Sequence, residues 1–108
     1  MVIKKIKEHL LTDQFLISNH ARQRMIGIKI TTNDLIEIIM NDEIIEDYPD
    51  DFPCPSLLVF SEYKDQIYHI VLGVCNDHLR IITVYIPDEK RWLNNKNRIK
   101  NTDDTEQM

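Results

Sequence analysis

The sequence lacks a long apolar stretch. No run approaches the roughly 18 uncharged apolar residues that a membrane-spanning helix needs. The N-terminal VIKKIKEHLLTD interleaves lysines and acids with its apolar residues, so it lacks the continuous apolar region of a signal peptide. We therefore expect a cytoplasmic protein with no membrane partner. At 108 residues, 43% of them hydrophobic, the chain has the size of one domain around one core.

Cysteine is scarce. Cys54 and Cys75 form neither a CxxC motif nor a Cys/His spacing typical of metal ligands. In a reducing cytosol, two such cysteines are expected to be free thiols. The sequence thus predicts no disulfide, no structural zinc and no bound metal or cofactor.

Positive charge is also in short supply. There are 13 Lys and Arg residues against 18 Asp and Glu residues, which gives a net charge of −5. A nucleic-acid partner needs a surplus of cations at the contact, so this total argues against one. The acids are concentrated, however: eight lie in residues 34–51, a segment without Lys or Arg, and removing these eight negative charges from the total of −5 leaves +3 for the remainder. A basic surface elsewhere is therefore compatible with the composition.

The N-terminal half has the pattern of short helices. Apolar residues at helical spacing predict helices over 2–12, over 19 to about 26 and over 33–40, with an extended piece at 14–17. Ser18 is predicted to cap the second helix and Gly27 to end it, while Thr31 or Thr32 caps the third. Residues 43–47 are predicted to be a strand or an extended segment that leaves the third helix. The proline-rich YPDDFPCP that follows is predicted to be a loop.

The C-terminal half has the pattern of a β-meander. Strands are predicted over 56–63, 66–75 and 78–87, joined by tight turns at Lys64-Asp65 and Asn76-Asp77. This predicts an α+β domain over residues 1–90, with N-terminal helices packed on an antiparallel meander. Residues 91–108 are polar and are predicted to be a disordered tail.

Two groups of residues are candidates for chemistry. His20 and Arg24 stand four apart on the second helix and share a face, while Arg22 points elsewhere. If Asn76-Asp77 is a two-residue turn, Gly73 faces Arg80. One side of the sheet would then carry His69, Arg80 and Val84 and the other Tyr68, Thr83 and Tyr85, and a one-residue change in the turn reverses these sides. The non-functional interpretation is that His20 and Arg24 lie on a solvent-exposed helix face. The strand residues would then be half-buried, with their hydrogen bonds made within the fold.

The order of these motifs resembles a known family. SNHARQRM (18–25), a Thr-capped helix beginning NDL (33–35), YHIV (68–71) and ITVY (82–85) follow one another from about Phe15 to Pro87. This order resembles a small bacterial family of unknown function with the pattern H-A-x-x-R-M, H-V-V, I-T-V-Y, whose members look like relatives of the RelE and BrnT toxins. The chain departs from that pattern at Ile28, where a second arginine is expected, and at Lys29, where glycine is expected.

The resemblance implies a function. It implies a RelE/BrnT-like fold and the toxin of a type II toxin-antitoxin system, a metal-independent endoribonuclease that cleaves RNA through attack of the 2′-OH. Its partners would be mRNA, with or without the ribosome, and an antitoxin of zinc-finger or helix-turn-helix type.

Such a reaction needs proton transfer and cations at the phosphate. His20 or His69 would move protons, and Arg24 and Arg80 would hold the scissile phosphate. Tyr85 or Tyr68 would stack on a base or take the second proton role. The hypothesis requires His20 and Arg24 to open onto a hollow shared with the strand residues. The alternative is a non-catalytic module that binds a basic partner through the acidic 34–51 surface.

Overall fold

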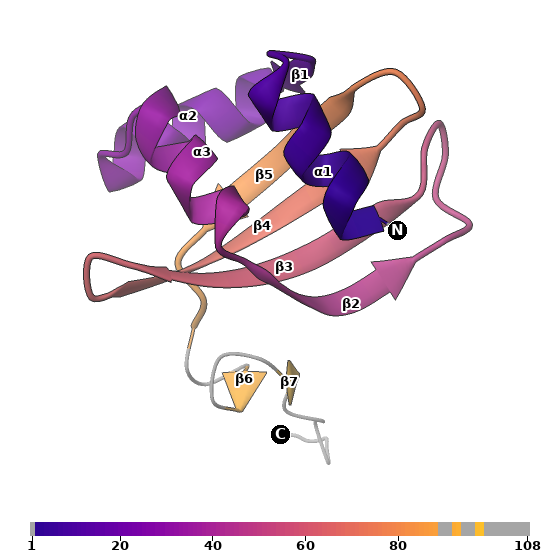
Figure 1. Ribbon diagram of the computed structural model, residues 1–108. Coiled ribbons are helices and arrows are strands. Elements are labelled where there is room, and N and C mark those ends of the chain that lie inside the picture. Colours follow the sequence, from indigo (N-terminus) through magenta and orange to yellow (C-terminus); the bar gives the residue numbers. More distant parts are fainter. Residues whose placement is uncertain (1, 89–91, 94–96, 99–108) are drawn as a thin grey trace.

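The fold is described from a computed structural model, which covers residues 2–88, 92–93 and 97–98 (Figure 1). Within these residues lie three helices and seven strands. In chain order they are α1 (Val2–Leu11), β1 (Phe15–Ile17), α2 (Asn19–Ile28), α3 (Thr32–Met40), β2 (Glu43–Tyr48), β3 (Ser56–Tyr63), β4 (Gln66–Val74), β5 (Leu79–Tyr85), β6 (Trp92–Leu93) and β7 (Asn97–Arg98). No helix of the described part is long and apolar enough to cross a membrane.

The main sheet has five strands in the order β1-β5-β4-β3-β2. Strands β2 to β5 are antiparallel neighbours, whereas β1 pairs in parallel with β5. All three helices lie on one face of this sheet in Figure 1. The α+β class and the antiparallel meander are therefore confirmed. The sheet is mixed, however, and the helices do not form one uninterrupted N-terminal block, because β1 lies between α1 and α2.

The two hairpins follow from their turns. Tyr63 pairs with Gln66, and beyond the Val74–Leu79 pair the Cys75 amide donates to the His78 carbonyl at 3.0 Å, so both predicted two-residue turns are confirmed. Lys64 and Asp65 have φ values of 50° and 65°, as a type I′ turn requires of its two central residues. These turns fix the register of β3, β4 and the start of β5.

The ends of α2 show one confirmed and one wrong prediction. The Ser18 hydroxyl accepts a hydrogen bond from the Ala21 amide, as expected of an N-cap. Gly27 does not end the helix, which continues to Ile28. Lys29 instead takes the left-handed conformation, with φ 60°, at the position where the resembled pattern has glycine. The Lys29 amide donates to the Ile26 carbonyl, and the Ile30 amide donates to the Met25 carbonyl. These two hydrogen bonds form a Schellman motif.

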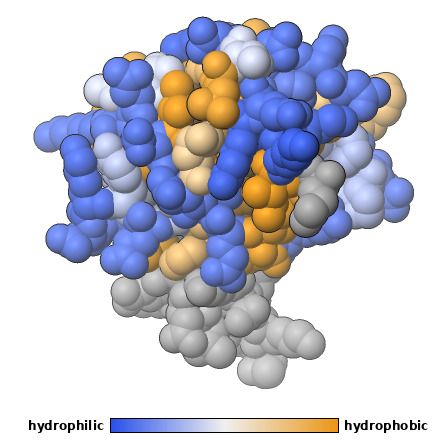
Figure 2. All heavy atoms as spheres, in the orientation of Figure 1, coloured by the Kyte–Doolittle hydropathy of each residue, from blue (hydrophilic) through white to orange (hydrophobic). Residues whose placement is uncertain are grey.

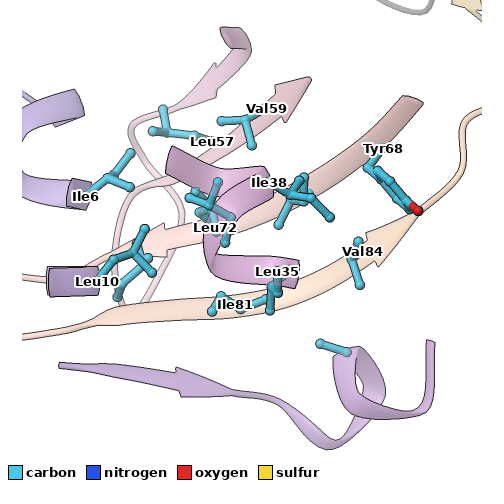
Figure 3. Close-up of a cluster of buried hydrophobic side chains, with 14 of the residues drawn as sticks. Ile6, Leu10, Leu35, Ile38, Leu57, Val59, Tyr68, Leu72, Ile81 and Val84 are labelled. Carbon is cyan, nitrogen blue, oxygen red and sulfur yellow. The ribbon is translucent and has the colours of Figure 1, made fainter. Parts of the chain in front are cut away.

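The core lies between the helices and the sheet (Figure 3). Apolar side chains from all three helices meet alternate residues of the strands, and the buried cluster comprises Ile6, Leu10, Ala21, Met25, Ile30, Leu35, Ile38, Ile39, Leu57, Val59, Tyr68, Ile70, Leu72, Val74, Leu79, Ile81 and Val84. The molecular surface seen in Figure 2 is mainly hydrophilic, with apolar residues in separate patches. The helix-facing side of β4 is therefore the Tyr68 side, and His69 points to the opposite face.

The predicted tail lies largely outside the described residues. Of positions 91–108, the structure describes only β6 and β7, which pair with each other in antiparallel fashion. The predicted boundary between the domain and the tail also falls in residues that are not described.

Candidate functional site

Strand β5 contains a bulge that rearranges the predicted faces. Gly73 pairs with Arg80, as predicted, but the register shifts so that Val71 pairs with Thr83 and Ile82 is left as the extra residue. Beyond this point His69 pairs with Tyr85 instead of Val84. The predicted grouping is therefore wrong at Val84, Thr83 and Tyr85: Val84 is in the helix-facing core, and the other two share the face of His69.

His69 is the centre of an aromatic cluster on that outer face. Its side chain is 0% exposed, and its Nδ1 lies 3.3 Å from the Tyr85 hydroxyl. The Tyr85 ring meets the imidazole edge-on with centroids 5.4 Å apart, and the Phe60 ring on β3 does so at 6.3 Å. Edge-to-face packing of this kind stabilises buried rings. His69 thus joins three strands, and a side chain buried so fully does not reach a substrate in this conformation.

His20 and Arg24 lie on the exposed side of α2. The helix is held to the sheet by Ala21 and Met25, which are 0% and 5% exposed, and by the Ser18 hydroxyl, which donates to the Ile82 carbonyl at 2.7 Å. The residues that precede Ala21 and Met25 are His20 and Arg24, and both are exposed. They share a helix face, as predicted from their spacing.

Arg80 lies at the other end of the outer face from the His69 cluster. It is half-buried, and a Cβ on Gly73 would lie 3.4 Å from the Arg80 Cβ and 3.8 Å from its Cδ, so the arginine stem runs over this glycine. Because His69 pairs with Tyr85 and Gly73 with Arg80, four positions along β4 separate the two pairs, a distance of about 13 Å at strand rise.

The five predicted residues therefore do not form one site. His69 and Tyr85 are in contact on the outer face of the sheet, and Arg80 is further along the same face. His20 and Arg24 lie on a helix that packs against the other face. Of these five residues, Arg80 alone lines the hollow described next.

A hollow at the sheet edge does bring Arg80 close to the start of α2. It has a volume of about 360 Å³ and is lined by Leu16, Ile17, Ser18, Asn19, Arg80, Ile81 and Ile82. We call it the edge hollow, because β1 is the edge strand of the sheet. Among the described residues that line it, Arg80 is the one cation, and Ser18 and Asn19 begin α2. The exposed His20 follows Asn19 directly. Ser18 was predicted as the cap of the helix and Asn19 as its first residue, and their shared lining follows from the parallel pairing of β1 with β5.

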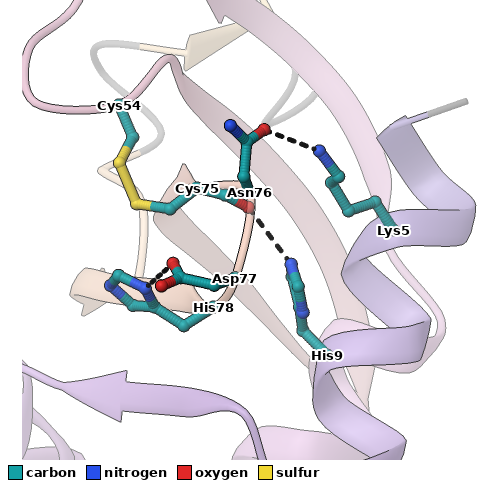
Figure 4. The surroundings of a disulfide bond; sticks show 7 residues. All are labelled: Lys5, His9, Cys54, Cys75, Asn76, Asp77 and His78. Atoms are coloured by element: carbon teal, nitrogen blue, oxygen red, sulfur yellow. Dashed lines mark hydrogen bonds and ion pairs between the residues drawn. A yellow bond between two sulfur atoms is a disulfide. The ribbon is translucent and has the colours of Figure 1, made fainter.

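The prediction of two free thiols is wrong. Cys54 and Cys75 form a disulfide, with Cα atoms 5.2 Å apart (Figure 4). Ser56 pairs with Gly73, and the cysteines lie two positions outside that pair on either strand. The Lys64-Asp65 turn alone fixes this register, so the turn was the sequence signal that places the cysteines opposite each other. Spacing motifs did not reveal it, because the pair is formed across a hairpin.

The same region anchors α1. The ring Nε2 of the buried His9 lies 3.1 Å from the Cys75 carbonyl, and Lys5 donates to the Asn76 side chain at 3.2 Å. At the turn, His78 Nδ1 lies 2.7 Å from an Asp77 carboxylate oxygen. Figure 4 shows these contacts around the disulfide. These contacts form a structural junction between α1 and the β4-β5 turn, and Cys75 and His78 are both part of it.

Asp42 is an acidic residue whose pKa is strongly raised by its surroundings. It lies between α3 and β2, and burial raises the pKa of its carboxyl to about 7, against the weaker effects of a backbone hydrogen bond and of Lys7. Its Oδ2 is buried and has no hydrogen-bond partner in the described part of the chain. The carboxyl therefore favours its protonated form in the folded protein. Nothing in the sequence pattern distinguishes this acid from its seven neighbours in 34–51.

The described residues contain no group of three or more His, Cys, Asp or Glu side chains arranged to hold a metal ion. The arrangement is thus an α+β domain with a five-stranded mixed sheet, an aromatic cluster on the outer face and a mainly apolar hollow at the sheet edge, where Arg80 supplies a positive charge.

The family of this domain is shown by its sequence. Residues 17–86 match the family model described as "Domain of unknown function (DUF4258)", which is more than half of the chain, so the protein belongs to this family. The match runs from the end of β1 to just beyond β5 and leaves out α1. No curated protein and no solved structure shows significant similarity to the chain.

Proposed function

We propose that the protein is a metal-independent endoribonuclease and the toxin of a type II toxin-antitoxin system, with its substrate phosphate in the edge hollow. The reaction class comes from the resemblance of the SNHARQRM, YHIV and ITVY motifs to RelE and BrnT toxins. The family match assigns no activity. The observation that carries the site is the convergence of Arg80 and the start of α2 on one hollow.

The residues around the hollow suit this reaction. The Arg80 guanidinium can donate two hydrogen bonds to a phosphate. Leu16 and Ile82 provide apolar walls that suit a nucleobase or sugar. His20 is exposed on the first turn of α2, where its imidazole can take the 2′-OH proton. Arg24 lies one turn further on the same helix face and would contact a neighbouring phosphate.

His69 and Tyr85 have a different role in this proposal. His69 and Tyr85 would support the sheet face on which Arg80 lies, instead of touching RNA. The direct proton roles considered for them are therefore assigned to His20 alone. The second proton carrier would be solvent or a group that the substrate brings.

Purified protein incubated with total RNA in EDTA tests the activity. The expected products end in 2′,3′-cyclic phosphate, because the 2′-OH is the nucleophile. Intact RNA after prolonged incubation, with and without ribosomes, would reject the nuclease. Co-expression with the neighbouring gene tests the antitoxin, which should abolish growth arrest and co-purify with the protein.

Variants test the site separately. Arg80→Ala and His20→Ala should each reduce cleavage by about 100-fold, the scale of one catalytic group. Arg22→Ala is the matched control, because Arg22 is an exposed arginine of the same helix outside the hollow. Equal activity of the Arg80 and Arg22 variants would show that cleavage, if present, takes place elsewhere.

A further inference from the structure

The loop between β2 and β3, residues 49–55, is held at several points. The Cys54–Cys75 disulfide ties it to the end of β4, and the Val74 amide donates to the Pro55 carbonyl at 2.8 Å. The Asp51 carboxylate accepts from the Ser56 hydroxyl. A loop fixed in this way loses little conformational entropy when another molecule binds to it.

This loop presents an aromatic side chain to solvent. Phe52 is 94% exposed, the highest value among the large apolar residues of the described part of the chain. Exposed to that degree, the ring contributes nothing to the core, and it retains all of its apolar area for burial against another surface. Aromatic side chains that lose water on binding are frequent hot spots of protein interfaces.

The charge around Phe52 selects the partner. Asp47 and Asp50 are exposed and precede Phe52 by five and two positions in the sequence, and residues 34–63 contain no Lys, Arg or His. A cation near this loop is Lys5 of α1, which shares a hollow with Pro55 at the end of the loop. An anionic surface of this kind favours a cationic partner and disfavours RNA, which would be repelled. The combination of a central aromatic ring and flanking acids is the pattern of a specific interface, with an apolar centre and a charged rim.

We propose that the 49–55 loop is a docking site for a cationic protein partner, which takes Phe52 into an apolar pocket and places Lys or Arg side chains against Asp47 and Asp50. The loop follows β2, at the opposite edge of the sheet from the edge hollow. The docking site therefore does not depend on the nuclease proposal, and a partner bound there leaves the hollow open.

Binding of a fluorescent Lys/Leu amphipathic peptide tests this proposal, with a Glu/Leu peptide of the same length as the control ligand. Phe52→Ala should weaken binding of the Lys/Leu peptide by about tenfold. Ile26→Ala is the matched control, because Ile26 is an apolar residue of α2 that is 77% exposed. Equal effects of the two substitutions, or equal affinity for the two peptides, would overturn the proposal.

Two further variants separate the contributions of charge and loop rigidity. Asp47→Asn with Asp50→Asn should weaken binding severalfold and reduce its dependence on salt, because fewer ion pairs form. Replacing both cysteines by serine should also weaken binding severalfold while the far-UV circular dichroism stays unchanged. Unchanged salt dependence in the first variant would contradict the role of the acids, and unchanged affinity in the second would contradict the role of the fixed loop.

Discussion

Asp42 makes the stability of this protein depend on pH in an unusual direction. In the unfolded chain its pKa has the ordinary value of 3.8, and burial raises the pKa to about 7 in the fold. Below about pH 4 the carboxyl is protonated in both states and has no effect. As the pH rises toward neutrality, the unfolded chain loses this proton first, so the fold is progressively destabilised. Above about pH 7 both states are ionised and the full destabilisation is present.

The size of this effect follows from the pKa change. A move from 3.8 to about 7 corresponds to roughly 4 kcal/mol for a fully enclosed group. Asp42 as a residue is half-buried, and this partial exposure to solvent reduces the expected value to about 2 kcal/mol. Asp42→Asn cannot ionise, so it should raise the free energy of unfolding by about 2 kcal/mol at about pH 8 and change it little at about pH 4.

Urea denaturation at these two pH values measures the difference. Glu37→Gln is the matched control, because Glu37 is an exposed acid of the neighbouring helix α3. The control should give similar changes at both pH values. If Asp42→Asn destabilises the protein at high pH, or gives equal effects at both pH values, then burial does not govern this carboxyl and the reasoning is refuted.

Three further predictions concern stability measured by urea denaturation. Replacing Cys54 and Cys75 by serine removes a cross-link across a sequence separation of 21 and should cost about 3 kcal/mol; wild type that is equally stable with and without a reductant would contradict this. Lys29→Gly should stabilise by about 0.5–1 kcal/mol, because glycine adopts a φ of 60° without steric cost; a lower denaturation midpoint would count against it. Ser18→Ala should cost about 1–2 kcal/mol, since its hydroxyl both caps α2 and bonds to the Ile82 carbonyl, and the same loss should appear in Ser18→Val.

The local structure of this chain could be predicted because its signals are short-range. Apolar spacing gave the helices, and the pairs Lys64-Asp65 and Asn76-Asp77 gave both hairpins and the pairing of Gly73 with Arg80. Caps were predicted at Ser18 and at Thr31 or Thr32, because a hydroxyl that precedes an apolar-periodic segment is a local pattern, and the cap of α3 is Thr31.

The candidate site was less accessible because it depends on three non-local features. The bulge at Ile82 exchanges the faces of Val84 and Tyr85, and no residue type marks it. The parallel pairing of β1 with β5 brings Leu16 beside Arg80, although three residues between two helices give almost no strand signal. The disulfide joins two strands of a hairpin, so the spacing of the cysteines along the chain does not indicate it, whereas the register set by the Lys64-Asp65 turn does.

The parallel pairing of β1 also has a consequence for synthesis on the ribosome. Phe15 to Ile17 emerge early, but their partners, Leu79 to Ile81, are among the last residues of the sheet to be made. The His9 contact with the Cys75 carbonyl has the same delay. The first helix and strand must therefore wait, unpaired at this edge, until nearly the whole domain has left the exit tunnel. A nascent chain stalled before β5 should consequently be open to proteolysis at its N-terminal end.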